Sequence, residues 1–442
     1  MNCELLVEGA AVLSLDPEWR IFEPGYVAIK SGAIVGIGPG AEARRWEPAR
    51  RLGGADSLVM PGFVNTHTHV SMAAFRGASE DVEDRLARFI FPLEKRLVKR
   101  DLVREAALFC LVEMAKSGTT TFADMYYFED EVAAAAKRAG LRCLLGETIV
   151  DFAAPDAAEA YGGLDYGLRF IEDFRGDPLV TPCLAPHAPY TVDAEHLSLV
   201  ARESARLGLP WMMHVAETLP EARRFGASHG STVKYLDSIG ALGPGLLAAH
   251  AIYVDDADVE ILARRDVSIA HCPASNAKSG RSIAPVWKYR EAGLRCGLAT
   301  DGPISGNGMD MQGIVGLYPK LQKVLTGRRD LVTAREALRA ATLGGAETLG
   351  MGALTGSLET GKRGDLIIVS IDDFNLRPVY DWYATAVYAM RPHNVRSVLV
   401  DGRLVVDEGR MTGIDEAECL ERMRGISESC RGEIARILGE RS

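Results

Sequence analysis

The sequence predicts a (β/α)₈ barrel of the TIM type, joined to a small β-sandwich domain built from the N- and C-terminal segments. Between residues 58 and 360, eight short apolar runs alternate with helical patterns. The segments on either side read instead as short strands. The length of 442 residues accommodates a barrel of about 250 residues and a smaller domain. We therefore expect a composite β domain over 1–57 and 361–442, which includes a C-terminal helix, and a catalytic barrel over 58–360.

The expected elements follow from hydrophobic periodicity and turn residues. The N-terminal strands are expected at residues 4–15, 26–37 and 52–60. The eight barrel strands are expected to end at Asn65, Ala123, Glu147, Ala185, Val215, Ala249, Ala270 and Ala299. Further strands are expected at residues 365–371, 395–400 and 403–406, and a charged helix at 415–442.

Composition argues against several classes of protein. The net charge is −10 and no basic cluster is present, so a nucleic-acid partner is not expected. The apolar runs are too short and too often interrupted by charge to span a bilayer, and we expect no membrane partner. Eight cysteines without a Cys-x-x-Cys pair are typical of reduced thiols, and the N-terminus carries no basic leader. We therefore expect a cytoplasmic protein with a small-molecule substrate.

The first barrel strand ends in two histidines, His67 and His69. Side chains two residues apart on a strand point to the same face, so both imidazoles aim at one point. Imidazole nitrogen is a ligand for zinc, iron or manganese. By itself, this pair fits a solvent-exposed or carboxylate-paired role as well as it fits a metal site.

Polar side chains also follow the ends of four other predicted barrel strands. His187 follows the fourth strand, His250 the sixth and Asp301 the eighth, while His214 is the last residue but one of the fifth strand and Glu217 follows that strand. At least five of the nine histidines therefore fall at the edge of the barrel where barrel enzymes build their active sites. This clustering strongly favours a metal site over incidental placement.

The ligand types indicate one divalent ion per chain. His67, His69, His214 and Asp301 supply three nitrogens and a carboxylate, and they leave a position for water. A site with two metals would need a bridging carboxylate or a modified lysine at the fourth strand, but residues 179–190 contain no Lys, Asp or Glu. These ligands suit Zn²⁺, Fe²⁺ or Mn²⁺.

Such an ion would lower the pKa of bound water towards about 7 and supply hydroxide at neutral pH. Glu217 is then placed to take the proton of the water and pass it to the substrate. His250 is expected to hold or polarise the attacking hydroxide. Asp301 is expected both to bind the metal and to accept a proton.

Four motifs resemble the amidohydrolase superfamily. They lie at residues 61–69 (Pro-Gly-Phe-Val-Asn-Thr-His-Thr-His), 214–217 (His-Val-Ala-Glu), 271–278 (His-Cys-Pro-Ala-Ser-Asn-Ala-Lys) and 300–302 (Thr-Asp-Gly). The branch that the chain most resembles contains the S-adenosylhomocysteine/5′-methylthioadenosine deaminases and related chlorohydrolases. The resemblance implies a mononuclear zinc-type hydrolase that displaces ammonia from an aromatic ring. It also implies a homo-oligomer, either a dimer or a tetramer.

By position in these motifs, the resemblance implies that Glu217 is the proton shuttle and that His250 lies beside the hydroxide. It further implies that His187 contacts a purine ring nitrogen and that Glu94 accepts hydrogen bonds from ribose hydroxyls. Glu94 also fits a solvated position on a helix.

Three departures concern the substrate side of the pocket. Leu164 follows a Gly-Gly pair where adenosylhomocysteine deaminases carry an arginine for the substrate carboxylate. The loops that contain Arg281 and residues 302–308 also differ from the usual pattern. The expected function is deamination of an adenosine-type nucleoside: 5′-methylthioadenosine, S-adenosylhomocysteine, 5′-deoxyadenosine or adenosine. The alternatives are a hydrolase of another amino- or chloro-substituted heterocycle, such as a triazine, a free purine base or a pterin, or a catalytically silent homologue.

Overall fold

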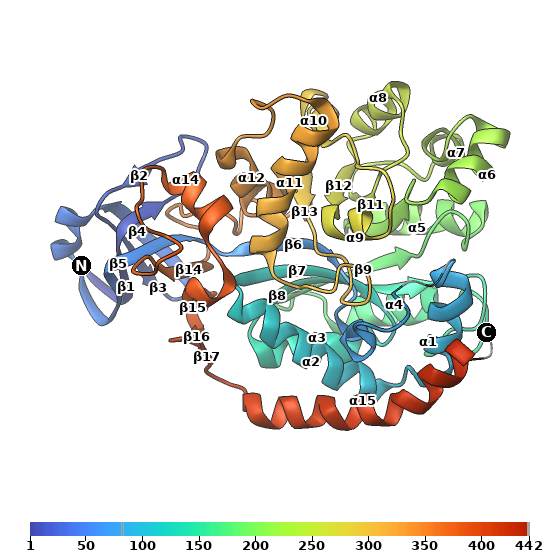
Figure 1. Cartoon of the computed structure of the whole chain (residues 1–442), viewed down its shortest axis with the longest axis horizontal. Helices are drawn as coiled ribbons and strands as arrows, with labels where there is room; N and C mark the ends of the chain where they lie inside the picture. The colour runs from blue at the N-terminus through green and yellow to red at the C-terminus, as the bar shows by residue number, and fades with distance from the viewer. Residues whose placement is uncertain (81, 83, 440–442) are drawn as a thin grey trace.

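The structure is a computed structural model that describes residues 1–80, 82 and 84–439. An eight-stranded parallel barrel forms the larger part, and a nine-stranded mixed sheet lies at the side that carries the N-terminus (Figure 1). The fold class expected from the sequence is therefore confirmed.

The barrel strands pair in chain order, each one parallel to the next, from β6 to β13. They are β6 (Phe63–Thr68), β7 (Thr119–Tyr126), β8 (Arg142–Ile149), β9 (Val180–Pro186), β10 (Trp211–Val215), β11 (Leu246–His250), β12 (Ser268–His271) and β13 (Cys296–Leu298). Every strand ends within three residues of its predicted end. All eight carboxyl ends therefore meet at one edge, as expected.

The barrel closes between β13 and β6 through hydrogen bonds near the carboxyl ends of these strands. Asn65 Nδ2 donates to Thr300 Oγ1 at 2.7 Å, and Thr300 N donates to Asn65 Oδ1 at 3.0 Å. One residue further on, Asp301 N donates to His67 O at 3.1 Å. This seam brings Asp301 beside the first histidine of the predicted metal site.

Helical segments connect the barrel strands and surround the barrel (Figure 1). They are η2 (Val70–Phe75), η3 (Leu86–Ile90), α1 (Phe91–Leu97), α2 (Arg100–Lys116), α3 (Glu129–Ala139), α4 (Gly162–Asp173), α5 (Ala194–Leu207), α6 (Leu219–His229), α7 (Thr232–Ser238), α8 (Asp256–Arg264), α9 (Pro273–Lys278), α10 (Val286–Glu291), α11 (Met311–Thr326), α12 (Ala334–Ala340) and α13 (Leu343–Thr348). Within the described residues, none of the helices combines the length and the apolar character that a membrane span requires.

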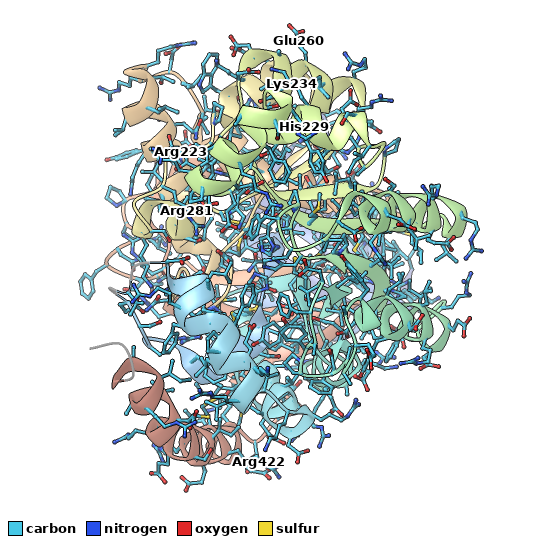
Figure 2. The ribbon with its side chains drawn as sticks, turned by 90° about the vertical axis from the view of Figure 1, so that its right-hand side faces the viewer. Arg223, His229, Lys234, Glu260, Arg281 and Arg422 are labelled. Carbon is cyan, nitrogen blue, oxygen red and sulfur yellow. The ribbon has the colours of Figure 1, made fainter. Side chains whose placement is uncertain are left out.

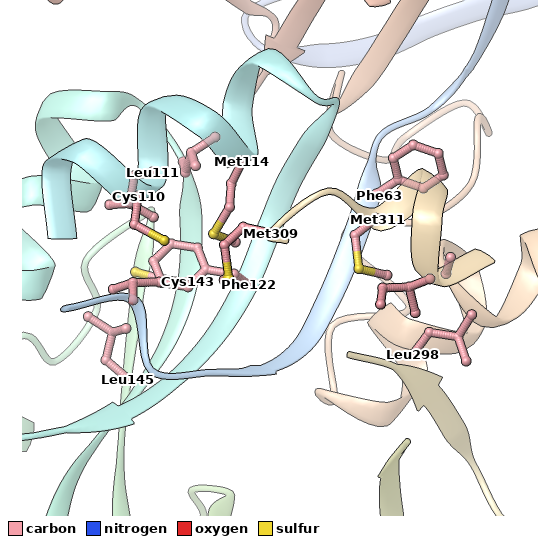
Figure 3. Close-up of a cluster of buried hydrophobic side chains, with 14 of the residues drawn as sticks. Phe63, Cys110, Leu111, Met114, Phe122, Cys143, Leu145, Leu298, Met309 and Met311 are labelled. Atoms are coloured by element: carbon pink, nitrogen blue, oxygen red, sulfur yellow. The ribbon is translucent and has the colours of Figure 1, made fainter. Parts of the chain in front are cut away.

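Apolar side chains fill both faces of the barrel strands. Figure 3 shows Phe122 of β7 and Cys143 of β8 with Cys110 and Met114 of α2, and all four are fully buried. Alternate residues of the same strands, such as Ala123, point inward and form a separate cluster inside the barrel. Full burial of a large apolar side chain such as Phe122 stabilises the fold by about 1.5–3 kcal/mol.

The mixed sheet joins the two ends of the chain. Its strands are β1 (Asn2–Leu13), β2 (Ile21–Phe22), β3 (Gly25–Lys30), β4 (Ala33–Pro39), β5 (Glu47–Pro61), β14 (Leu366–Ser370), β15 (Val395–Val400), β16 (Arg403–Asp407) and β17 (Arg410–Met411). Strand β14 pairs antiparallel with β5, so the N- and C-terminal segments share one sheet. Short helical segments lie in the same two regions of the sequence: η1 (Gly40–Arg45), α14 (Trp382–Ala384), η4 (Thr385–Ala389) and η5 (Pro392–Asn394). The division at residues 57/58 and 360/361 stays a prediction.

The C-terminal helix α15 (Glu416–Gly439) lies along the barrel helices (Figure 1). Arg422 of α15 donates to Glu105 of α2 at 3.0 Å, and Lys116 at the end of α2 pairs with Glu416 at 2.5 Å. The predicted helix at 415–442 agrees with α15 as far as Gly439, and residues 440–442 lie outside the described residues.

Candidate metal centre and active site

Three histidine rings meet at the carboxyl ends of β6 and β10. His69 Nδ1 donates to the carbonyl oxygen of Met125 at 2.6 Å, and His214 Nδ1 donates to that of His187 at 2.8 Å. Because a neutral imidazole carries one hydrogen, the Nε2 atom of each ring is left with a lone pair. These two Nε2 atoms lie 3.4 Å apart. Two lone pairs at this distance repel each other unless a cation lies between them.

His67 and Asp301 complete the set. Both ring nitrogens of His67 are buried, and neither has a hydrogen-bond partner among the described residues. Asp301 Oδ1 lies 3.9 Å from His67 Nε2 and 3.5 Å from His69 Nε2. Burial lowers the pKa of His67 well below its usual range and that of His214 to about 4, so both rings are neutral at neutral pH, as metal ligands must be. The four predicted ligands thus fit a divalent cation.

A second possible group combines His67 with His250 and Cys272. The Cys272 thiol lies 3.7 Å from the carbonyl oxygen of Ala270, and burial raises the pKa of this thiol well above its usual range. A metal would need the thiolate form. The group of His67, His69 and His214 is therefore the better candidate.

Glu217 and His250 lie next to this centre. His250 Nε2 is 3.4 Å from Glu217 Oε1, and His250 Nδ1 lies 3.0 Å from Asn276 Oδ1. Arg281 Nη1 also donates to Glu217 Oε1. Burial alone would raise the pKa of Glu217, but the positive charges of His250 and Arg281 outweigh it and lower the pKa to about 2. Glu217 is therefore a carboxylate at neutral pH.

The backbone that carries Glu217 is held by Glu221, a residue that the sequence analysis missed. The Glu221 carboxylate accepts the N–H groups of Ala216 at 2.7 Å and of Glu217 at 2.9 Å. Thr218 and Glu221 form a capping box at the start of α6. The pattern Thr-x-x-Glu before a helix is a known signature of this box and would have identified Glu221.

Two further side chains support the ligands and were also missed. Asp124 of β7 accepts from Val70 N at 2.6 Å, in the segment directly after His69. Ser275 Oγ of α9 donates to Asp301 Oδ2 at 2.5 Å. Asp124 carries no sequence signal of its own, because its contact joins two segments that are distant along the chain. Ser275 lies in the motif at residues 271–278, but the motif alone did not indicate its contact with Asp301.

The centre lies in a cavity of about 850 Å³ at the carboxyl ends of the strands. Some of the residues proposed to bind the metal or to transfer protons line this cavity: His69, His214, Glu217 and Asp301. His67 and His250 are buried behind the wall. Both predicted substrate residues, His187 and Glu94, also line the cavity. The structure therefore brings together all the residues that the sequence singled out for this site.

His187 and Glu94 differ in their surroundings. His187 Nδ1 lies 2.8 Å from Thr191 Oγ1, and burial lowers the pKa of this histidine well below its usual range. Glu94 lies on α1 and is almost fully buried, so a solvated position on a helix is excluded. Burial raises the pKa of Glu94 to about 8, and the hydroxyls of Tyr126 and Tyr127 partly offset this shift.

The three departures from the family pattern have different outcomes. Leu164 does not line the cavity, and its side chain packs against the hydrophobic core. Arg281 lines the cavity from the segment after α9, which Figure 2 shows with Arg281 labelled. From residues 302–308, Ser305 reaches the wall.

Known proteins resemble this chain over almost its whole length. The profile of the Amidohydrolase family matches residues 58–405. A 5-methylthioadenosine/S-adenosylhomocysteine deaminase of Syntrophobacter fumaroxidans is 39% identical over 97% of this chain and 99% of its own length. A 5′-deoxyadenosine deaminase of Methanosarcina acetivorans is 36% identical over 96% of this chain and 98% of its own length.

Among solved structures, an adenosine deaminase from Xanthomonas campestris with bound zinc has a TM-score of 0.95 and is 31% identical. The match covers 98% of this chain and 99% of that one. The resemblance inferred from the four motifs is thus confirmed. The chain belongs to the amidohydrolase family.

Proposed function

We propose that the protein is a metal-dependent hydrolytic deaminase of an adenosine-type nucleoside, which releases ammonia. The observation that carries this proposal is the convergence of three histidine rings and Asp301 on one point beside Glu217. The named activities of the relatives support a nucleoside as substrate. We propose one ion per chain and zinc as its identity, supported by the zinc in the Xanthomonas structure.

A divalent ion bound here would lower the pKa of a water molecule towards neutrality. The ionised Glu217 carboxylate is then the base that takes a proton from the water and donates it to a ring nitrogen. His250 donates through Nδ1 to Asn276 with the amide oriented as in the structure, so its Nε2 is available to the attacking water. Asp301, held by Ser275, is a ligand and a second proton acceptor.

The rest of the cavity fits a ring with a sugar attached. His187 is neutral and lies close to His214, with ring centroids 4.9 Å apart, so it can hydrogen-bond to a purine nitrogen. Phe91 packs edge-on against His187, with the ring centroids 5.8 Å apart, and provides an apolar wall. Glu94 lies one helical turn along α1 from Phe91 and would accept from ribose hydroxyls.

The proposal also includes a cytoplasmic location and a homo-oligomer. Phe374 and Tyr380, which are almost completely exposed, support association of copies. Sedimentation of the purified protein tests the oligomeric state. A catalytically silent homologue would be expected to lack ligands, whereas all four proposed ligands are present.

A panel of amino- and chloro-substituted rings tests the proposal. The zinc-loaded protein should release ammonia from 5′-methylthioadenosine, 5′-deoxyadenosine or adenosine faster than from guanine, a pterin or an aminotriazine. Release of chloride from a chlorotriazine, or of ammonia only from a free base or pterin, would overturn the substrate assignment. Inactivity on the whole panel would contradict the proposal that the substrate is an adenosine-type nucleoside.

A further inference from the structure

The turn after α9 directs Arg281 into the cavity. Gly280 adopts a φ of +64°, in the left-handed region that favours glycine. Arg281 N then donates back to Asn276 O at 3.0 Å, which fixes the start of the Arg281 side chain. Its guanidinium reaches across the cavity to Glu217. The position of Arg281 is thus set by the backbone of the same short helix that carries Asn276.

This helix contacts three of the groups proposed to handle protons. Ser275 binds Asp301, and Asn276 binds His250. Arg281 makes the third contact, with Glu217. Helix α9 and the turn after it therefore contact all three groups. Among the hydrogen bonds of the described residues, Arg281 is the only link from this segment to Glu217.

The pair between Arg281 and Glu217 is largely shielded from water. The Glu217 side chain is 12% exposed and that of Arg281 is 26% exposed. A pair with this shielding holds its geometry better than one on the surface. Both Arg281 Nη1 and His250 Nε2 approach the same oxygen, Oε1. No hydrogen bond within the described residues reaches Oε2, so this oxygen is left for the substrate.

We propose that Arg281 is a positioning residue for the proton shuttle: it anchors Oε1 of Glu217 and thereby directs Oε2 to the ring nitrogen. This inference rests on the proposed function, in which Glu217 transfers the proton. Glu221 fixes the backbone of Glu217 but not its carboxylate, which can still rotate about the side-chain torsions. Arg281 removes that freedom. Displacement of a reacting group by about 1 Å lowers the reaction rate by about 10²-fold. The loss of this anchor should therefore cause a measurable decrease in rate.

Kinetics of Arg281→Ala and Arg281→Lys with 5′-methylthioadenosine test the proposal. We expect kcat to fall about 10²-fold in Arg281→Ala while KM and zinc content change little. Arg281→Lys keeps the charge without the planar fork, and its kcat should be intermediate. Added guanidinium, below concentrations that unfold the protein, should restore part of the activity of Arg281→Ala. A kcat equal to or above that of the native enzyme in Arg281→Ala would overturn the proposal.

Arg265→Ala is the matched control. Arg265 also donates to a carboxylate, that of Asp237 at 2.6 Å, but it does not line the cavity. This variant should keep the native kcat, and guanidinium should not increase it. An equal loss of kcat in Arg265→Ala would show that the loss of any arginine–carboxylate pair has this effect and would contradict a specific role of Arg281.

Crystal structures separate this inference from the proposed function. In Arg281→Ala, the Glu217 carboxylate should rotate or lose order while its backbone stays in place. A carboxylate that keeps its position without Arg281 would overturn the inference, whatever the substrate is. If the native protein deaminates no nucleoside, the proposed function fails, and the comparison of the two structures still decides whether Arg281 positions Glu217.

Discussion

The Nε2 atoms of His69 and His214 lie 3.4 Å apart, and the hydrogen bonds of both rings place the proton on the opposite nitrogen. Together with His67, whose ring nitrogens are buried without a partner among the described residues, this arrangement leaves three lone pairs that converge. Burial of such groups without partners is costly. A cation bound at this point would remove that cost and would explain why the fold tolerates the arrangement.

Removal of the shuttle carboxylate should slow turnover and leave the metal in place. Glu217 lies beside the proposed ligands and is not counted among them. Glu217→Gln should therefore reduce kcat by about 10²-fold or more, the range found for general acid–base groups. Steady-state kinetics and elemental analysis of the same preparation measure both quantities. Loss of the metal in Glu217→Gln would make Glu217 a ligand.

Glu221→Ala should lower both stability and activity. This substitution leaves the N–H groups of Ala216 and Glu217 without their acceptor, at a cost of about 1–3 kcal/mol each if they stay buried. The loop that carries Glu217 then loses its fixed geometry, so kcat should also fall. Thermal denaturation and kinetics test this expectation. Glu221→Gln retains a carbonyl oxygen and should retain more stability, and equal losses in the two variants would contradict the proposed role of the acceptor.

The pKa of Glu94, raised by burial to about 8, predicts a pH dependence for substrate binding. Ribose hydroxyls donate to the ionised carboxylate, and the ionised fraction increases as the pH rises through about 8. The value of kcat/KM should therefore rise with pH up to this region and then level off. This rise should be absent in Glu94→Gln. A native profile that is flat or falls between pH values of about 6 and 9 would contradict the assigned role of Glu94.

Substrates without a charged amino-acid end should be preferred. A buried carboxylate needs a cationic partner. Arg281 already binds Glu217, and Lys278 pairs with Glu80. Arg85 donates to the carbonyl oxygen of Ile304, and Arg224 lies over the ring of Phe225. We therefore expect a higher kcat/KM for 5′-methylthioadenosine, 5′-deoxyadenosine or adenosine than for S-adenosylhomocysteine. Leu164 lies outside the cavity wall and therefore makes no contact that would contribute to this preference. A preference for S-adenosylhomocysteine that disappears in Arg281→Ala would show that Arg281 binds the carboxylate of the substrate.

Much of the metal centre was predictable from the sequence because it depends on regular strands. His67 and His69 share a face by strand periodicity, and the carboxyl ends of parallel strands bring His214 and Asp301 to the same edge. The supporting contacts of Asp124 were not predictable, since they depend on the register between β6 and β7.

Loops limited the prediction on the substrate side. The position of Leu164 after two glycines says nothing about the direction of its side chain, and the structure turns it to the core. Arg281 reaches the cavity only because Gly280 adopts a left-handed conformation. Such backbone choices depend on contacts across the fold and leave a weak signal in the sequence.

Titration of the metal-stripped protein with zinc tests the central claim most directly. Deamination of 5′-methylthioadenosine should be absent without metal, increase linearly with added zinc and reach its maximum at one ion per chain. His214→Ala lacks one of the proposed ligands and should neither bind zinc tightly nor regain activity. A maximum at two ions per chain, full activity after metal removal or a fully active His214→Ala would contradict the mononuclear, metal-dependent account.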